Sequence, residues 1–173
     1  MFGLLWLVPA IPFASALVLA VVRFPRRVVA WIAVCSIAAS TIASLLVTAS
    51  FLSTPPATNA YTQVLWTWLD VGGFHPEIAF YLDPLSLIMV VVVAFVSFLI
   101  HLYSTEFMID DDGYSRFFAY MNLFVASMLT LLLANDLLLL YLGWEGVGLC
   151  SYLLIGFWYR DPENGRAGRK AFI

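Results

Sequence analysis

The chain has 173 residues, of which 63% are hydrophobic and only 11% are charged. Soluble domains carry about 25% charged residues, so this composition excludes an ordinary water-soluble globular domain. The net charge of −3 comes without any basic patch, which excludes the usual signature of a nucleic-acid partner.

Apolar runs of about 20 residues, the length that crosses a bilayer as a helix, recur along the chain. We expect membrane spans at about residues 2–22, 28–51, 84–103, 115–134 and 137–159. The predicted fold class is an all-α polytopic membrane protein, with five transmembrane helices and the start of a sixth at Lys170. We therefore interpret residues 1–173 as a single transmembrane region, the N-terminal part of a longer subunit.

Local signals support these boundaries. Pro9 and Pro12 are expected to bend the first span, which membrane helices tolerate when neighbours satisfy the backbone. Asp83 followed by Pro84 is a strong helix-start signal for the third span. Asp136 interrupts the last long apolar run and is expected to cap the fifth span.

The loop at residues 52–83 contains two segments rich in β-forming residues, Tyr61–Leu69 and Ile78–Leu82, with Gly72–Gly73 between them. This pattern predicts a short β-hairpin on the outer surface. The aromatic residues of the loop equally predict an interfacial belt at the lipid headgroups, and the two interpretations are compatible.

Basic residues predict the orientation. They gather in three places that five spans put on one side of the membrane: Arg23, Arg26 and Arg27; Arg116; and Arg160, Arg166, Arg169 and Lys170. The positive-inside rule makes this side the cytoplasm, or the matrix of an organelle, and puts the N-terminus outside. We expect a multi-pass protein of the bacterial inner (plasma) membrane, with an organellar membrane as the open alternative.

The two cysteines, Cys35 and Cys150, both lie in apolar runs without metal-ligand spacing. We expect small core-filling residues, with a disulfide between them as the alternative. Nucleotide-binding glycine motifs and cysteine or histidine clusters are also missing from the sequence. We therefore expect no cofactor-binding and no metal site in this chain.

Glu145 is the strongest candidate functional residue. It lies about nine residues after Asp136, which puts its carboxyl group about 13 Å into the bilayer. An ionisable group at this depth costs several kcal/mol and usually marks a proton or ion path. The alternative is a neutral, hydrogen-bonded carboxyl that only joins helices.

Helical spacing gives Glu145 its predicted neighbours. The residues that share its face are Tyr141, Leu142, Gly148, Leu149 and Tyr152. Tyr141 and Tyr152 are possible supporting residues. His101 is a third, although a histidine at the inner end of the third span also fits a contact with headgroups. Lys170, the only lysine, lies outside the membrane, so we expect a cationic partner from another chain or a further segment.

Several segments resemble one known family. They are LDPLS at Leu82–Ser86, YLGWEGVGLCSYLLIGF at Tyr141–Phe157, and the shorter Asp161–Pro162, Asn164–Gly165 and Lys170–Phe172. The chain is similar to the largest antiporter-like membrane subunit of respiratory complex I, called subunit L in bacteria and chain 5 elsewhere. The resemblance implies an enzyme subunit, part of a proton-translocating NADH:quinone oxidoreductase. It also implies that Glu145 takes part in proton translocation and pairs with a lysine of a later helix.

The resemblance further implies partners and cofactors. Partners would be the lipid bilayer and other membrane subunits of complex I, especially a neighbouring antiporter-like subunit. NADH, flavin, iron–sulfur clusters and quinone would belong to partner subunits, with none in this chain. Subunits of multi-subunit sodium/proton antiporters and membrane-bound hydrogenases share a membrane Glu after a Trp and are the second interpretation. A structural membrane scaffold in which Glu145 stays neutral is the third.

Overall fold

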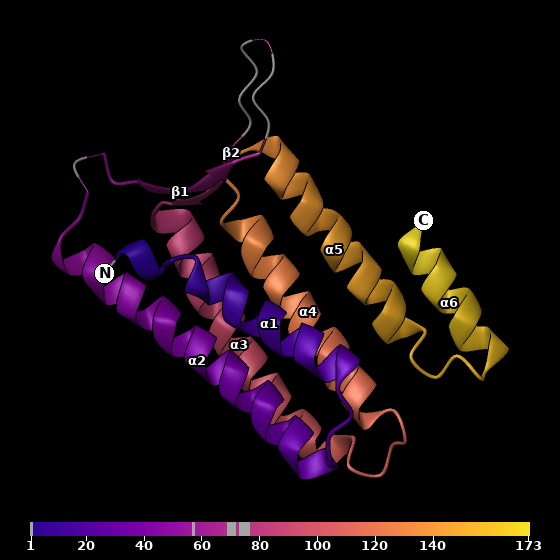
Figure 1. Cartoon of the computed structure of the whole chain (residues 1–173). Helices are drawn as coiled ribbons and strands as arrows, with labels where there is room; N and C mark the ends of the chain where they lie inside the picture. The colour runs from indigo at the N-terminus through magenta and orange to yellow at the C-terminus, as the bar shows by residue number, and fades with distance from the viewer. Residues whose placement is uncertain (1, 57, 69–71, 73–76) are drawn as a thin grey trace.

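The computed structural model describes residues 2–56, 58–68, 72 and 77–173. The elements in chain order are η1 (Phe2–Leu4), α1 (Leu7–Val21), α2 (Arg26–Ser53), β1 (Tyr61–Thr67), β2 (Glu77–Leu82), α3 (Pro84–Phe107), α4 (Tyr114–Leu132), α5 (Leu137–Ile155) and α6 (Pro162–Phe172). Figure 1 shows α1 to α5 running along one bundle, with the two strands across one end and α6 beside α5. The predicted helical polytopic class is confirmed.

Helices α2, α3, α4 and α5 are long and apolar enough to cross a membrane, and the chain is an integral membrane protein. The first predicted span is different, because α1 has only 15 residues. At 1.5 Å per residue such a helix covers about 22 Å, less than a ~30 Å hydrocarbon core. The residues before it form a 3₁₀ turn tied to β1: Gln63 accepts from the Trp6 amide (3.2 Å) and donates to the Gly3 carbonyl (3.0 Å).

Pro12 lies inside α1 and is accommodated by a hydrogen bond from α2. Proline has no amide hydrogen, so the carbonyl of Val8, four residues earlier, loses its usual donor. The Ser40 hydroxyl of α2 donates to that carbonyl at 2.6 Å, and Ser40 is fully buried. The helix is therefore completed by its neighbour, as a membrane interior requires.

Asn122 of α4 joins three helices through its fully buried amide. Its carbonyl oxygen lies 2.8 Å from the Ser15 hydroxyl of α1 and 2.7 Å from the Ser36 hydroxyl of α2. Its amide nitrogen donates to the Phe118 carbonyl at 2.9 Å. A buried amide would be costly if left unpaired, so these bonds select one packing of α1, α2 and α4.

Both predicted N-caps are confirmed. The Asp83 carboxylate accepts from the Ser86 amide at 2.7 Å, and the Ser86 hydroxyl accepts from the Asp83 amide at 2.8 Å. The Ser86 amide lowers the pKa of the Asp83 carboxyl. Asp136 likewise accepts from the Leu139 amide at 2.8 Å and starts α5.

The predicted hairpin is also confirmed in its described part. Strands β1 and β2 pair antiparallel from Tyr61↔Leu82 to Thr67↔Glu77, with an irregularity between Val64 and Trp66. Residues 69–71 and 73–76, which include Gly73 of the predicted turn, lie outside the described residues.

Strand β2 also bonds to the turn between α4 and α5. The Tyr81 amide donates to the Leu133 carbonyl at 2.7 Å, and the Asn135 amide donates to the Ala79 carbonyl at 3.1 Å. The buried side chains of Phe80 and Leu82 pack into the same core as Leu133. The hairpin thereby holds the beginning of α5 against the end of the bundle.

The prediction that both cysteines fill the core is wrong for one of them. Cys150 of α5 is buried, but Cys35 of α2 is exposed, and both are free thiols. Helix α2 packs through Ala33, Ile37 and Ser40. Cys35 is two residues after Ala33, a turn of about 200°, and therefore lies on the nearly opposite face of the helix.

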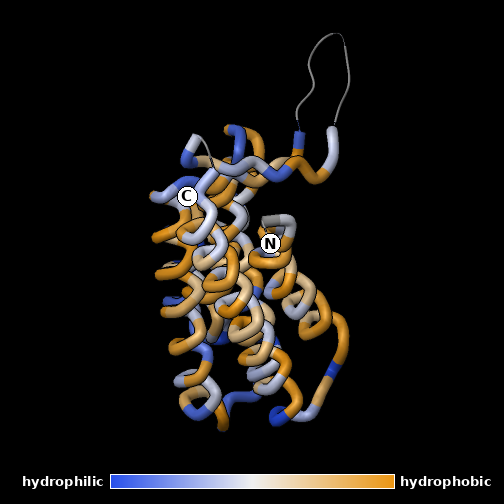
Figure 2. The backbone as a smooth tube through the Cα atoms, turned by 90° about the vertical axis from the view of Figure 1, so that its left-hand side faces the viewer, coloured by the Kyte–Doolittle hydropathy of each residue, from blue (hydrophilic) through white to orange (hydrophobic). Residues whose placement is uncertain are grey.

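The basic segments lie together in space. The connections before α2, before α4 and after α5 are all at the end of the bundle opposite the hairpin (Figure 1). Figure 2 shows hydrophilic segments at this end of the tube as well as in the hairpin region. One end of the molecule therefore carries Arg23, Arg26, Arg27, Arg116 and Arg160.

We predict that Ser40→Ala destabilises the full-length chain by about 1 kcal/mol, because the Val8 carbonyl loses its donor. In a Pro12→Ala background the same change should cost much less, because the alanine introduced there supplies the missing amide hydrogen. Unfolding in mixed micelles would measure both costs. Equal costs in the two backgrounds would contradict this coupling.

Candidate functional site

Two glycines set the contact between α5 and α4. A Cβ added to Gly143 would lie 2.8 Å from the Leu131 backbone, and one added to Gly146 would lie 2.6 Å from the Ser127 Oγ. Cys150, on the same face of α5, is fully buried. The two helices therefore approach through small residues, as is common in membrane bundles.

This contact turns the face that carries Glu145 away from α4. Glu145 is exposed, and so are its neighbours Tyr141, Leu142, Leu149 and Tyr152. Only 17% of the most apolar stretch of α5 is buried inside the protein, whereas 39% of the corresponding stretch of α2 is buried. Glu145 thus lies in the middle of a spanning helix on a face that the described part of the chain leaves uncovered.

The surroundings of Glu145 are almost entirely apolar. It borders a hollow of about 160 Å³ whose other lining residues are Trp68, Ile78, Leu138, Leu139, Tyr141 and Leu142. The Tyr141 side chain interacts with the Glu145 carboxylate one turn away. None of the ion pairs among the described residues includes Glu145. The structure therefore brings one predicted supporting residue, Tyr141, to the carboxylate.

Tyr152 shares the face of Glu145 but contacts α6 instead. Its ring lies 5.7 Å from that of Phe172, and a Cβ added to Gly168 would lie 3.2 Å from the Tyr152 carbonyl. Seven residues along a helix separate Tyr152 from Glu145 by about 10 Å. Helix α6 begins at Pro162, has 11 residues and is rich in polar side chains, so it is not the predicted sixth transmembrane helix. The start of that helix at Lys170 stays a prediction.

The side chain of His101 is completely buried by the protein, so it does not contact headgroups as one interpretation expected. Its Nδ1 lies 2.8 Å from the Ser97 carbonyl, and its Nε2 has no hydrogen-bond partner among the described residues. The ring is 6.1 Å from that of Phe118 on α4. The structure therefore places His101 in the contact between α3 and α4 rather than with Glu145.

A sequence signal for this burial exists. Ala94, His101 and Ser104 are buried and lie seven and three residues apart on one face of α3. Small and polar residues at helical spacing mark helix–helix contacts in membranes, and this pattern identifies the packed face.

The comparisons with known proteins agree with one another. Residues 68–118 match the family described as NADH-ubiquinone oxidoreductase (complex I), chain 5 N-terminus. Residues 134–173, which include Glu145, match NADH:quinone oxidoreductase/Mrp antiporter, TM. NADH-quinone oxidoreductase subunit L of Escherichia coli is 51% identical over 87% of this chain. The chain belongs to the subunit L (chain 5) family of complex I.

Other members of the subunit L family extend this similarity. Subunit L of Mycobacterium tuberculosis is 42% identical over 97% of the chain. The NAD(P)H-quinone oxidoreductase subunit 5 of the Paulinella chromatophora chromatophore is 36% identical over 98%. The chain spans about a quarter of the length of these curated relatives: 24% of the E. coli, 27% of the M. tuberculosis and 26% of the P. chromatophora protein.

No three His, Cys, Asp or Glu side chains among the described residues lie close enough to hold a metal ion. The expectation that the redox cofactors bind to other subunits of complex I, and not to this chain, stays a prediction.

We predict that Gly143→Ala impairs folding of the full-length chain, because its new methyl group would meet the Leu131 backbone, which cannot move aside cheaply. Gly148→Ala is the matched control, since nothing lies within 4 Å of its added Cβ. The yield of monodisperse protein after extraction measures the difference. Equal yields for the two variants would show that α4 and α5 do not meet at Gly143.

Proposed function

We propose that this subunit L family chain takes part in proton translocation coupled to quinone reduction, as a membrane subunit of an NADH:quinone oxidoreductase. Glu145 would be the carboxylate that takes up and releases the proton. The observation that carries the proposal is the position of Glu145, in the middle of α5 on an uncovered apolar face.

The physical basis is the balance between the two charge states of this carboxyl group. An ionised carboxylate in hydrocarbon costs several kcal/mol, whereas the neutral acid costs far less. Tyr141 is a hydroxyl donor at the site and supplies no positive charge. A cation brought to the uncovered face would stabilise the ionised form and favour proton release. Its withdrawal would favour proton uptake, so movement of a neighbouring charge drives the cycle.

No ion pair among the described residues includes Glu145, so we propose that the cation comes from a further segment or another chain. Five arginines lie at the end of the bundle opposite the hairpin, and Arg166, Arg169 and Lys170 lie on α6, whereas Glu145 is in the middle of α5. We propose that a further helix of a subunit L protein, or a neighbouring antiporter-like subunit of complex I, supplies a lysine. NADH, flavin, iron–sulfur clusters and quinone would act in other subunits, and this chain would contribute no redox step.

We further propose that the chain resides in a bacterial inner membrane with its N-terminus outside. The basic connections lie together at one end of the bundle, and the positive-inside rule assigns that end to the cytoplasm. The subunit L relatives of E. coli and M. tuberculosis are bacterial proteins, which supports this location.

A sodium/proton antiporter subunit is the second candidate, because one matching family is described by both names. The chain 5 match at residues 68–118 and the names of the relatives favour the oxidoreductase.

Glu145→Gln in the full-length chain should lower proton transport at least about tenfold while leaving assembly intact, because glutamine keeps the shape but cannot exchange a proton. Dye quenching in inverted membrane vesicles, driven by NADH, measures transport, and native gels measure assembly.

Glu106→Gln is the matched control, since this acid lies at the exposed end of α3. It should leave transport unchanged. Unaltered transport in Glu145→Gln would overturn the proton-carrying role, and failed assembly in that variant would favour the scaffold. NADH-independent exchange of sodium for protons by the isolated protein would favour the antiporter.

A further inference from the structure

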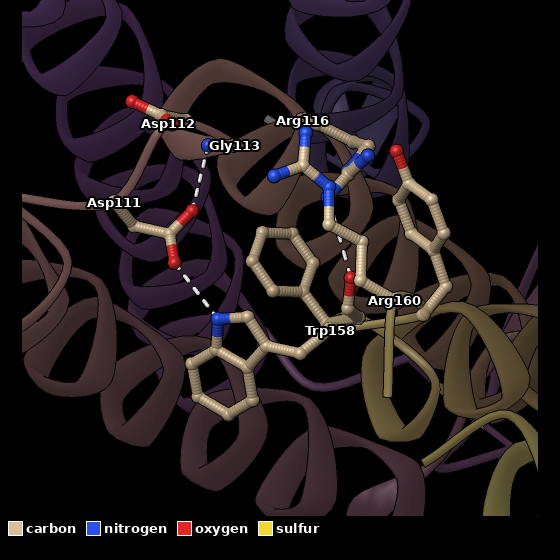
Figure 3. A pocket seen from close by; sticks show the side chains of 8 residues that line it. Asp111, Asp112, Gly113, Arg116, Trp158 and Arg160 are labelled. Carbon is tan, nitrogen blue, oxygen red and sulfur yellow. Dashed lines mark hydrogen bonds between the residues drawn. The ribbon is translucent and has the colours of Figure 1, made fainter. Parts of the chain in front are cut away.

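A polar pocket lies at the end of the bundle opposite the hairpin, where the connection between α3 and α4 meets the connection between α5 and α6 (Figure 3). Its volume is about 330 Å³. Its charged lining residues are two arginines, Arg116 and Arg160, and two aspartates, Asp111 and Asp112. These side chains carry no net charge together.

On one side of the pocket, Arg116 packs against two aromatic rings. The Arg116 guanidinium lies 4.7 Å from the centroid of the Phe157 ring and 5.0 Å from that of Tyr159. Its Nη2 donates a hydrogen bond to the Phe157 carbonyl at 3.3 Å. A hydrogen bond with Arg116, then the positive charge of Arg116 and that of Arg160, lower the pKa of the Tyr159 hydroxyl. None of the ion pairs among the described residues includes either arginine, so most of their donors remain available.

On the other side of the pocket, hydrogen bonds fix the Asp111 carboxylate. One Asp111 oxygen accepts from the Gly113 amide at 2.6 Å, and the other accepts from the Trp158 indole at 2.8 Å. These bonds, the Trp158 one first, lower the pKa of Asp111, so it is ionised at neutral pH. Each oxygen keeps a further lone pair. Asp112 is fully exposed and lies 3.9 Å from Arg26.

Because Gly113 has no Cβ, the space between Arg116 and Asp111 stays open. A Cβ at this position would lie 3.0 Å from both Arg116 Nη2 and Asp111 Oδ1. The two charged atoms are therefore at most about 6 Å apart, yet they do not reach the ~4 Å of an ion pair. The Phe157 Cζ lies 2.7 Å from the same point, so this ring borders the glycine together with the two charged side chains. Opposite charges thus lie near each other without forming a direct ion pair.

We propose that this pocket binds the headgroup of a zwitterionic phospholipid of the phosphatidylethanolamine class. The lipid phosphate would accept from Arg116 and Arg160, and its ammonium group would donate to Asp111. The pocket lies at the ends of the spanning helices α4 and α5, where headgroups are found. Trp158 and Tyr159 are exposed beside it, as aromatic residues at a membrane interface commonly are.

The charge pattern selects this headgroup over others. A phosphatidylglycerol headgroup or free phosphate would satisfy the arginines but has no cation, so the charge of Asp111 would stay without a counter-charge. A phosphatidylcholine headgroup has a cation without N–H donors, so it cannot hydrogen-bond to Asp111. Among these headgroups, ethanolamine is the one that offers both the anion and the donating cation. The proposal does not depend on the role of Glu145.

The test uses the full-length chain in its native assembly, stripped of lipid in detergent and incubated with equimolar phosphatidylethanolamine and phosphatidylglycerol. Native mass spectrometry counts the lipids that remain bound. The wild type should prefer phosphatidylethanolamine. Arg160→Gln should weaken its binding about tenfold through the lost charge-assisted hydrogen bonds. Arg23→Gln is the matched control: it removes the same charge at the same end of the bundle but outside the pocket, and it should change nothing.

Asp111→Asn provides a second variant that does not rely on the arginines. It should shift the preference toward phosphatidylglycerol, because the pocket becomes positive. Equal losses in Arg23→Gln and Arg160→Gln would overturn the proposal in favour of diffuse attraction. An unchanged preference in Asp111→Asn would overturn it too. Competition by inorganic phosphate as strong as by lipid would assign the pocket to a free anion instead.

Discussion

The close contact of α4 and α5 at Gly143 and Gly146 determines which way each side of α5 faces. Once two backbones meet through glycines, the helix cannot rotate without losing that contact. The opposite face, with Glu145 and Tyr141, must then look away from the bundle. The hairpin reinforces this orientation, because β2 bonds to the turn that starts α5.

The polar groups of the molecule divide into two kinds. Asn122 and the Val8 carbonyl, inside the bundle, are satisfied by its own helices, through Ser15 and Ser36 and through Ser40. The buried Nε2 of His101 is the exception among the described residues. The Glu145 carboxyl group is exposed, and among the described residues Tyr141 is the polar side chain that interacts with it. Hydrocarbon supplies no hydrogen bonds. Polar groups that bond to neighbouring helices therefore stabilise the fold, whereas an ionised acid facing lipid is costly unless a further group pairs with it. This difference separates residues that build the subunit L chain from the residue proposed to move a proton.

Features that depend on a few neighbouring residues, such as helix caps and the hairpin, could be predicted from the sequence. Asp83 and Asp136 cap their helices because an acceptor side chain before an apolar run meets a free amide whatever the tertiary fold. The hairpin followed from two β-rich segments for a similar reason. The first span was longer in prediction than α1 is, since the docking of its first residues on Gln63 depends on a strand more than fifty residues away.

The sequence by itself determined that the chain is a membrane protein, that Glu145 is in the middle of a spanning helix, and that the basic residues share one side. These follow from composition and helical rise, which are properties of each segment alone. Only the tertiary structure decided that His101 is buried, that Cys35 is exposed, and that Tyr141 rather than Tyr152 accompanies Glu145. It also brought Arg116 and Asp111 to Trp158 and Tyr159. These outcomes depend on which faces of neighbouring helices meet, and that choice is made by packing between segments distant in the chain.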